Sequence, residues 1–60
     1  MDPKLLIRNK EYTLQSNSGI KTEVIYVHET INHYVFINNI QIFQLTPSTV
    51  NTQIYAKQME

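Results

Sequence analysis

Residues 34–45 constrain the fold most, because they read as one β-hairpin whose two faces are both apolar. Two β-rich runs, residues 34–37 and 40–45, flank Asn38 and Asn39. Asparagine tolerates positive φ better than any residue except glycine, so this pair predicts a two-residue type I′ connection that places Ile37 opposite Ile40. A single sheet in a chain of 60 residues has one core to face. The second apolar face therefore needs another partner.

The two faces of this hairpin differ in chemistry, because side chains alternate along each strand. One face carries β-branched aliphatic residues that suit a dry core, namely Val35, Ile37, Ile40 and Ile42. The other face carries Tyr34, Phe36, Phe43 and Leu45. A tyrosine hydroxyl needs water or a hydrogen-bond partner, so the aromatic face suits a partly wet surface or an interface. The alternative is that the curvature of a small barrel wraps these aromatics into the same core.

The chain length predicts one domain, residues 1–60, that has little stability to spare. Cysteine is absent, so no disulfide can stabilise the fold. Small scaffolds without disulfides often depend on oligomerisation, because a single small core barely offsets the entropy of ordering the chain. We therefore expect a homo-oligomer or an obligate protein partner.

Two segments before the hairpin also read as β-strands. Residues 5–14 form one long or broken first strand with Asn9 at the break, and residues 20–29 form a second strand that becomes apolar on both faces at its centre. A strand with that change enters the middle of a sheet or bends around a barrel. Turns follow each strand, at residues 16–19 and 30–32, and Gly19 is expected to adopt a left-handed conformation.

The segment after the hairpin predicts a helical turn, because Thr46 is a good N-cap and Pro47 suits the first helical position. Residues 49–52 are poor helix formers. We therefore expect a short 3₁₀ turn near Pro47 and a final strand over residues 52–57. An antiparallel β-sheet with a C-terminal helix is the alternative.

This order of elements resembles the small SH3-like barrels over roughly residues 10–55. The residues that carry the resemblance are Tyr12-Thr13-Leu14, residues 24–27, the Asn38-Asn39 hairpin and residues 45–50. In that family a short 3₁₀ turn containing proline commonly precedes the closing strand. The resemblance implies an all-β fold, a small five-stranded barrel. Members that bind proline-rich peptides use a tryptophan and an acidic loop, which this sequence lacks, so polyproline recognition is not implied.

The charge pattern argues against nucleic-acid binding as the first choice. Five Lys or Arg residues balance five Asp or Glu residues, whereas phosphate recognition usually requires a basic stripe. The local excess at Lys4, Arg8 and Lys10 is flanked by acidic residues and suits charges that protect an edge strand. A nucleic-acid-binding barrel that uses these residues with Lys21 is the alternative.

Catalytic and ligand-binding signatures are weak in this sequence. His28, Glu29 and His33 are the one constellation that could hold a metal, but their spacing matches no established zinc motif. Serines occupy turn positions, where their hydroxyls serve the backbone. One glycine cannot form a phosphate-binding loop. We expect no enzyme activity, no cofactor, no metal and no small-molecule substrate.

The aromatic residues remain as candidates for protein binding, since aromatic side chains often anchor interfaces. The predicted contact residues are Tyr26, Tyr34, Phe36 and Phe43. The leading hypothesis is a non-enzymatic protein-binding barrel that self-associates, of the kind that phages and other mobile elements use against a host protein. A structural subunit of a larger assembly is a further alternative. No transmembrane span and no signal peptide are evident in the sequence, so a cytoplasmic location is expected.

Overall fold

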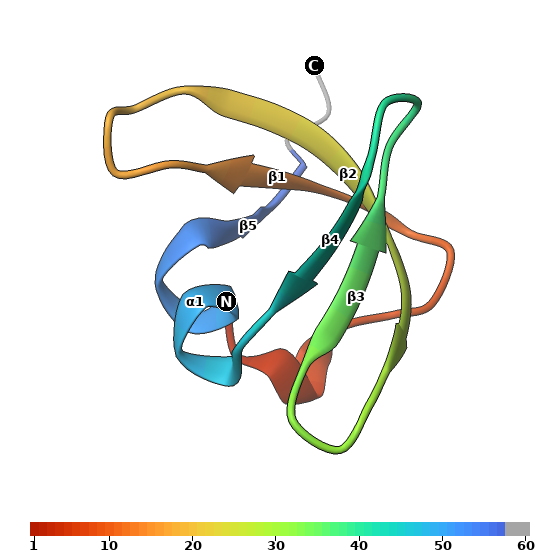
Figure 1. The fold of residues 1–60 in the computed structure, drawn as a ribbon. Coiled ribbons are helices and arrows are strands. Elements are labelled where there is room, and N and C mark those ends of the chain that lie inside the picture. Colours follow the sequence, from red (N-terminus) through yellow and green to blue (C-terminus); the bar gives the residue numbers. More distant parts are fainter. Residues whose placement is uncertain (58–60) are drawn as a thin grey trace.

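The computed structural model describes residues 1–57, which form a five-stranded antiparallel sheet, a 3₁₀ turn and one short α-helix (Figure 1). In chain order the elements are η1 (Pro3–Leu5), β1 (Glu11–Gln15), β2 (Lys21–Glu29), β3 (Tyr34–Ile37), β4 (Ile42–Leu45), α1 (Pro47–Gln53) and β5 (Ile54–Ala56). The strand order is β4-β3-β2-β1-β5. Five strands in an antiparallel sheet are therefore confirmed. The sheet is open, because β4 and β5 are its two edges and do not pair within residues 1–57.

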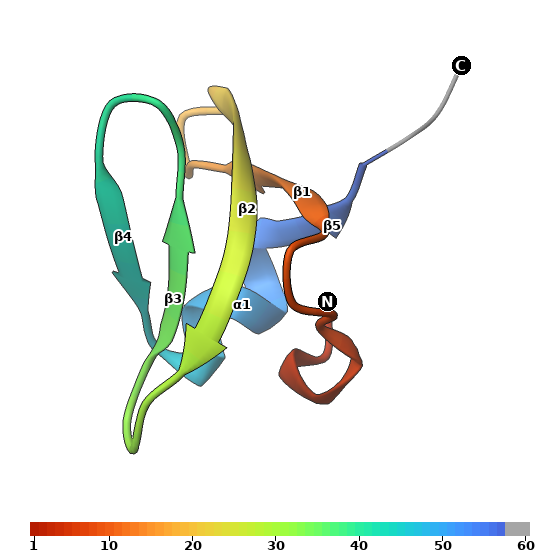
Figure 2. The ribbon, with the colours of Figure 1, turned by 90° about the vertical axis from the view of Figure 1, so that its right-hand side faces the viewer.

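The longest strand, β2, joins the two parts of the sheet. Residues 21–25 pair with β1 and residues 25–29 pair with β3. A β-bulge between Tyr26 and His28 interrupts the second pairing, and bulges bend a strand and increase its twist. In Figure 2, β3 and β4 run alongside β2 whereas β1 and β5 cross behind it. The predicted position of this strand in the middle of the sheet is confirmed.

The register of the β3–β4 hairpin differs from the prediction. Ile37 lies opposite Ile42 rather than Ile40, and Phe36 lies opposite Phe43. The turn therefore comes one residue later along the chain than predicted. Because the pairing shifts by two residues, no side chain changes face.

The side chain of Asn38 accounts for this difference. Its Oδ1 accepts hydrogen bonds from the backbone N–H groups of Ile40 (2.8 Å) and Gln41 (2.9 Å). The Asn38 N–H also donates to the carbonyl oxygen of Gln41 at 3.1 Å. Within residues 1–57, Asn9 is the only residue other than glycine with positive φ, which excludes a type I′ turn. Asparagine here serves as a hydrogen-bond acceptor and not as a left-handed residue.

The core lies on the aromatic face of the sheet, so the assignment of the aliphatic face to the core is wrong. The buried core residues are Tyr12, Val24, Tyr26, Phe36, Val50 and Ile54. On the aliphatic face only Val35 is buried, whereas Ile37, Ile40 and Ile42 are exposed. The alternative in which curvature brings the aromatics inward is confirmed only in part: the aromatics do pack in the core, but three of the four aliphatic residues do not share that core with them.

The segment after β4 forms an α-helix and not the predicted 3₁₀ turn, and β5 begins at Ile54. Thr46 is the N-cap, as predicted, and its Oγ1 accepts a hydrogen bond from the Thr49 N–H at 3.2 Å. The Val50 N–H donates to the Thr46 carbonyl at 3.0 Å, and the Val50 side chain is fully buried. Burial of one helical residue therefore outweighs the weak helix propensity of its neighbours.

The predicted strand over residues 5–7 is wrong, because the chain there follows a 3₁₀ turn capped by Asp2. Proline at the start of η1 cannot donate to a ladder, which favours the turn. The predicted break at Asn9 is confirmed by its φ of 68°, and the predicted left-handed Gly19 by its φ of 88°. The amino group of Met1 donates to carbonyl oxygens at the end of α1. These bonds hold the N-terminal segment against the helix.

Candidate functional site

The predicted contact aromatics lie mainly in the core. Tyr26 and Phe36 are buried, with ring centroids 5.3 Å apart. Tyr34 and Phe43 are partly buried and pack against the same cluster. Burial raises the pKa of the Tyr26 hydroxyl, and the Glu29 carboxylate raises it further. All four rings are thus brought together, but they stabilise the fold and leave little aromatic surface for another chain.

The exposed apolar surface is aliphatic and lies on the opposite side of the sheet. Ile25, Ile37 and Ile42 lie opposite one another across β2, β3 and β4. Ile37 and Ile42 are 37% and 68% exposed, and Ile40, in the turn, is 86% exposed. We call Ile37, Ile40 and Ile42 the isoleucine patch. Single exposed apolar residues are ordinary, but a contiguous group on one hairpin marks a candidate contact site.

The turn geometry explains why Ile40 is so exposed. The Asn38–Gln41 hydrogen bond leaves Asn39 and Ile40 as the central residues of the turn. Polar residues and glycine usually occupy such positions. Ile40 therefore contributes no burial energy to the folded monomer, since most of its side chain stays in water.

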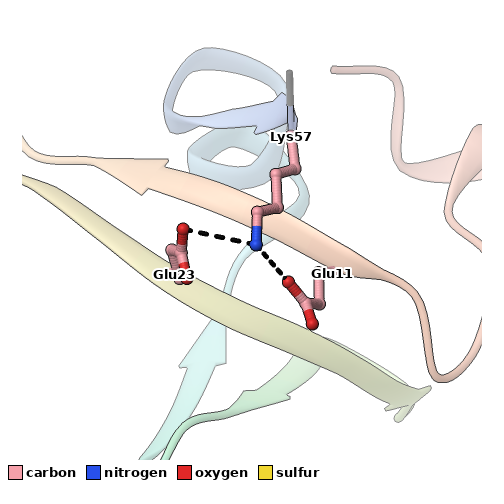
Figure 3. A network of polar contacts seen from close by, with 3 residues as sticks. All are labelled: Glu11, Glu23 and Lys57. Atoms are coloured by element: carbon pink, nitrogen blue, oxygen red, sulfur yellow. Dashed lines mark hydrogen bonds and ion pairs between the residues drawn. The ribbon is translucent and has the colours of Figure 1, made fainter. Parts of the chain in front are cut away.

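Charged residues occupy the other half of the same outer surface (Figure 3). The Lys57 ammonium contacts the carboxylates of Glu11 at 2.5 Å and Glu23 at 3.4 Å. Its hydrogen bond with Glu11, and then that with Glu23, raises the pKa of Lys57. By contrast, residues 34–56 include no Asp, Glu, Lys or Arg. The outer surface therefore has a charged half, formed by β1, the first part of β2 and Lys57, and an uncharged half over β3 and β4.

The basic residues proposed for nucleic-acid binding do not share one element or one end of the sheet. Lys4 lies in η1, and Arg8 and Lys10 lie in the segment before β1. Lys10 Nζ is 6.0 Å from the centre of the Tyr12 ring. Lys21 lies opposite Gln15 at the far end of the β1–β2 ladder. The fold thus gives these four cations no common stripe.

The two histidines lie near the turn between β2 and β3. His28 lies opposite Val35 near the end of β2, and His33 closes the next turn by accepting a backbone hydrogen bond from Thr30 at 2.7 Å. Within residues 1–57, no group of three or more His, Cys, Asp or Glu side chains is placed to hold a metal. No helix in that part of the chain has the length and apolar character needed to cross a membrane.

Two shallow grooves lie on the outer surface. One, of about 220 Å³, runs beside the isoleucine patch and includes Ile25, Ile37 and Asn38 in its walls. The other, of about 350 Å³, lies over β1, β2 and β5 and includes Lys21, Glu23 and Tyr55. Both are open to solvent, so neither isolates a reacting group from water.

Sequence reasoning singled out the aromatics and missed the isoleucine patch. The β-branched side chains of this patch predict a dry interior, but all three are exposed. One feature of the sequence does point to the isoleucine patch, namely the absence of charge throughout residues 34–56. A hairpin face that is only solvated normally carries charged side chains. Comparison of the chain with protein-family models, with curated proteins and with solved structures finds no match.

Proposed function

We propose that this protein is a non-enzymatic protein-binding domain that contacts its partner through the isoleucine patch. The observation that carries this proposal is the exposure of Ile40 and Ile42, at 86% and 68%, on an uncharged hairpin. The folded monomer stabilises neither side chain by burial. A partner surface that covered them would do so.

The size of the hydrophobic effect makes this patch sufficient as a binding anchor. Complete burial of one isoleucine side chain contributes about 1.5–3 kcal/mol. Interfaces typically draw most of their affinity from a few such residues at their centre, with polar residues around them. Asn39 and Gln44 supply that polar surround here, without a charge whose desolvation would oppose binding.

The nature of the surface favours protein over nucleic acid as the partner. Phosphate contacts supply most nucleic-acid affinity and require clustered cations. The four proposed cations are distributed over η1, the following segment and the far end of β2. The uncharged half of the molecule offers no compensating basic side chain.

Site-specific photo-crosslinking in cells tests this proposal. A photoreactive phenylalanine analogue replaces Ile40 in one sample and Ser18, an exposed residue of the β1–β2 turn, in the control. The proposal expects one dominant crosslinked protein from position 40 that is absent from position 18. Identical crosslinking patterns from both positions would exclude the isoleucine patch as a binding site.

We also propose that the architecture is that of the SH3-like barrels. Supporting observations are the bent β2 that pairs with both neighbours and the helical turn with Pro47 before β5. A solution structure by nuclear magnetic resonance tests the closure of the barrel. Side-chain contacts between β4 and β5, the two edges of the open sheet, would support closure, and the lack of such contacts would contradict it.

A further inference from the structure

The two edges of the sheet differ in how they are protected. β5 is three residues long and is followed by Lys57, whose side chain bridges to β1 and β2. β4 has neither charge nor proline, and its pairing with β3 is regular along its whole length. Natural sheets usually protect an exposed edge with charges, proline or a bulge. In the part of the chain described, nothing pairs with the outer edge of β4.

The turn hydrogen bond identifies the backbone groups that this edge presents. In an antiparallel ladder, residue pairs alternate between hydrogen-bonded and non-hydrogen-bonded. Because Asn38 bonds to Gln41, the next hydrogen-bonded pair is Phe36 with Phe43. The N–H and C=O groups of Ile42 and Gln44 therefore point away from β3. The edge thus offers two donors and two acceptors, spaced two residues apart.

We propose that β4 pairs antiparallel with β4 of a second copy of this chain, about a two-fold axis at Phe43. In this register Ile42 lies opposite Gln44 of the partner subunit, and Gln44 lies opposite the partner's Ile42. All four outward backbone groups on each strand are then hydrogen-bonded. Registers centred on Ile42 or Gln44 would bring fewer of these groups together. The result is a continuous sheet in which the two copies contribute all their strands.

Charge and symmetry favour a second copy as the occupant of this edge. The chain has a formal net charge of zero, so two copies do not repel each other at long range. Each copy brings only uncharged residues to the junction, because residues 34–56 carry no charge. The spacing of the outward groups is self-complementary, as an interface with two-fold symmetry requires. This inference rests on the proposed protein-binding role of the isoleucine patch and specifies the partner.

Solution mass across a concentration series tests the pairing, with the full chain throughout. The wild-type chain should double its mass from 7.1 kDa as concentration rises. Gln44→Pro removes an outward N–H and leaves the β3–β4 bonds intact, and proline is tolerated at such edge positions. Ile42→Lys places a charge on the same edge. Because each change acts twice in a symmetric dimer, each should weaken association by about 30-fold.

A matched control and a folding check accompany these variants. Ser18→Lys adds the same charge as Ile42→Lys on an exposed turn away from β4, and it should associate like the wild type. Circular dichroism should show that the variants are folded. If Gln44→Pro does not fold, Ile42→Lys alone decides the result. A dimer that persists unchanged in the folded variants would overturn the pairing.

Cysteine crosslinking tests the register directly, because the natural chain has no cysteine. Ile42→Cys and Gln44→Cys chains are mixed and oxidised. Directly opposed residues have Cα atoms about 5.5 Å apart, within the range of a disulfide. Identical positions lie on a diagonal, at about 7–8 Å or more, which disfavours a bridge. The mixed disulfide should therefore exceed both like-with-like products. A statistical mixture, or an excess of like-with-like products, would overturn this register.

The outcomes separate this inference from the proposed function. A chain that stays monomeric at all concentrations, yet crosslinks from position 40 to one other protein, overturns the pairing and retains the proposed function. Crosslinks from position 40 that match those from position 18 overturn the proposed function itself. A crosslinked product of twice the chain mass, lost in Ile42→Lys, supports both.

Discussion

At the scale of single residues, the hydroxyl of Tyr12 stabilises the fold through one hydrogen bond. Tyr12 is almost completely buried, and its hydroxyl oxygen accepts a hydrogen bond from the Ile7 N–H at 2.8 Å. Tyr12→Phe keeps the ring in the core and removes only this acceptor. We expect the free energy of unfolding to fall by about 1 kcal/mol, as measured by urea titration.

Tyr55→Phe provides the matched control for this prediction. The Tyr55 hydroxyl donates to the Thr52 carbonyl at 3.1 Å, but both groups are exposed to water. Its removal should change the stability by less than about 0.5 kcal/mol. Equal effects of the two substitutions would show that the Tyr12 hydrogen bond contributes nothing specific.

Gly19 is the residue whose backbone conformation the sequence predicted best. It has a φ of 88°, and a Cβ atom built there meets no other atom within 4 Å. Gly19→Ala therefore introduces strain in the backbone without a steric clash. We expect a loss of about 1–2 kcal/mol in the free energy of unfolding, measured by thermal denaturation. Gly19→Asn should cost less, because asparagine adopts this conformation more readily. An alanine variant as stable as the wild type would contradict the prediction.

At the scale of elements, local signals predicted which segments form strands but not which face is buried. Alternation separated Phe36 and Phe43 from Ile37 and Ile42 correctly. The choice between the faces depends on the direction in which the sheet curves and on where α1 packs. Both are set by contacts between distant segments, such as Phe36 with Tyr12 at 6.4 Å between ring centroids. No local pattern within the hairpin contains that information.

Helix propensity predicted a 3₁₀ turn where the chain forms α1. A substitution at the N-cap, Thr46, tests which interactions stabilise this helix. Seven residues are too few for a stable isolated helix. The Thr46 side chain and the buried Val50 must therefore hold it in place. Thr46→Ala should lower the free energy of unfolding by about 1 kcal/mol. Thr46→Ser keeps the acceptor and should restore most of that loss when both variants are compared by urea titration. Equal stability of the two variants would contradict a capping role.

At the scale of the whole molecule, the chain has more apolar surface than one core can use. The bent sheet encloses the aromatic residues on one side and leaves Ile37, Ile40 and Ile42 outside. The sequence predicted this excess of apolar residues but placed the unused surface on the wrong face. Whether an aromatic or an aliphatic face ends up outside depends on the final curvature, which strand patterns alone do not determine.

The stability of the whole molecule should fall at alkaline pH, because folding raises the pKa of Tyr26 and of Lys57. Burial raises the pKa of the Tyr26 hydroxyl above its ordinary value of 10.0, and the hydrogen bonds with Glu11 and Glu23 raise that of Lys57 above 10.5. Each group holds its proton more tightly in the folded state, so above these values the folded chain binds more protons than the unfolded chain. The stabilising contribution of the two groups is therefore fully present below about pH 10 and is lost as pH rises through their folded-state pKa values.

Urea titrations between about pH 8 and about pH 11 should show this decline. Tyr26→Phe removes the phenol and should make the decline shallower. A decline in Tyr26→Phe as steep as that of the wild type would assign the alkaline transition to other groups.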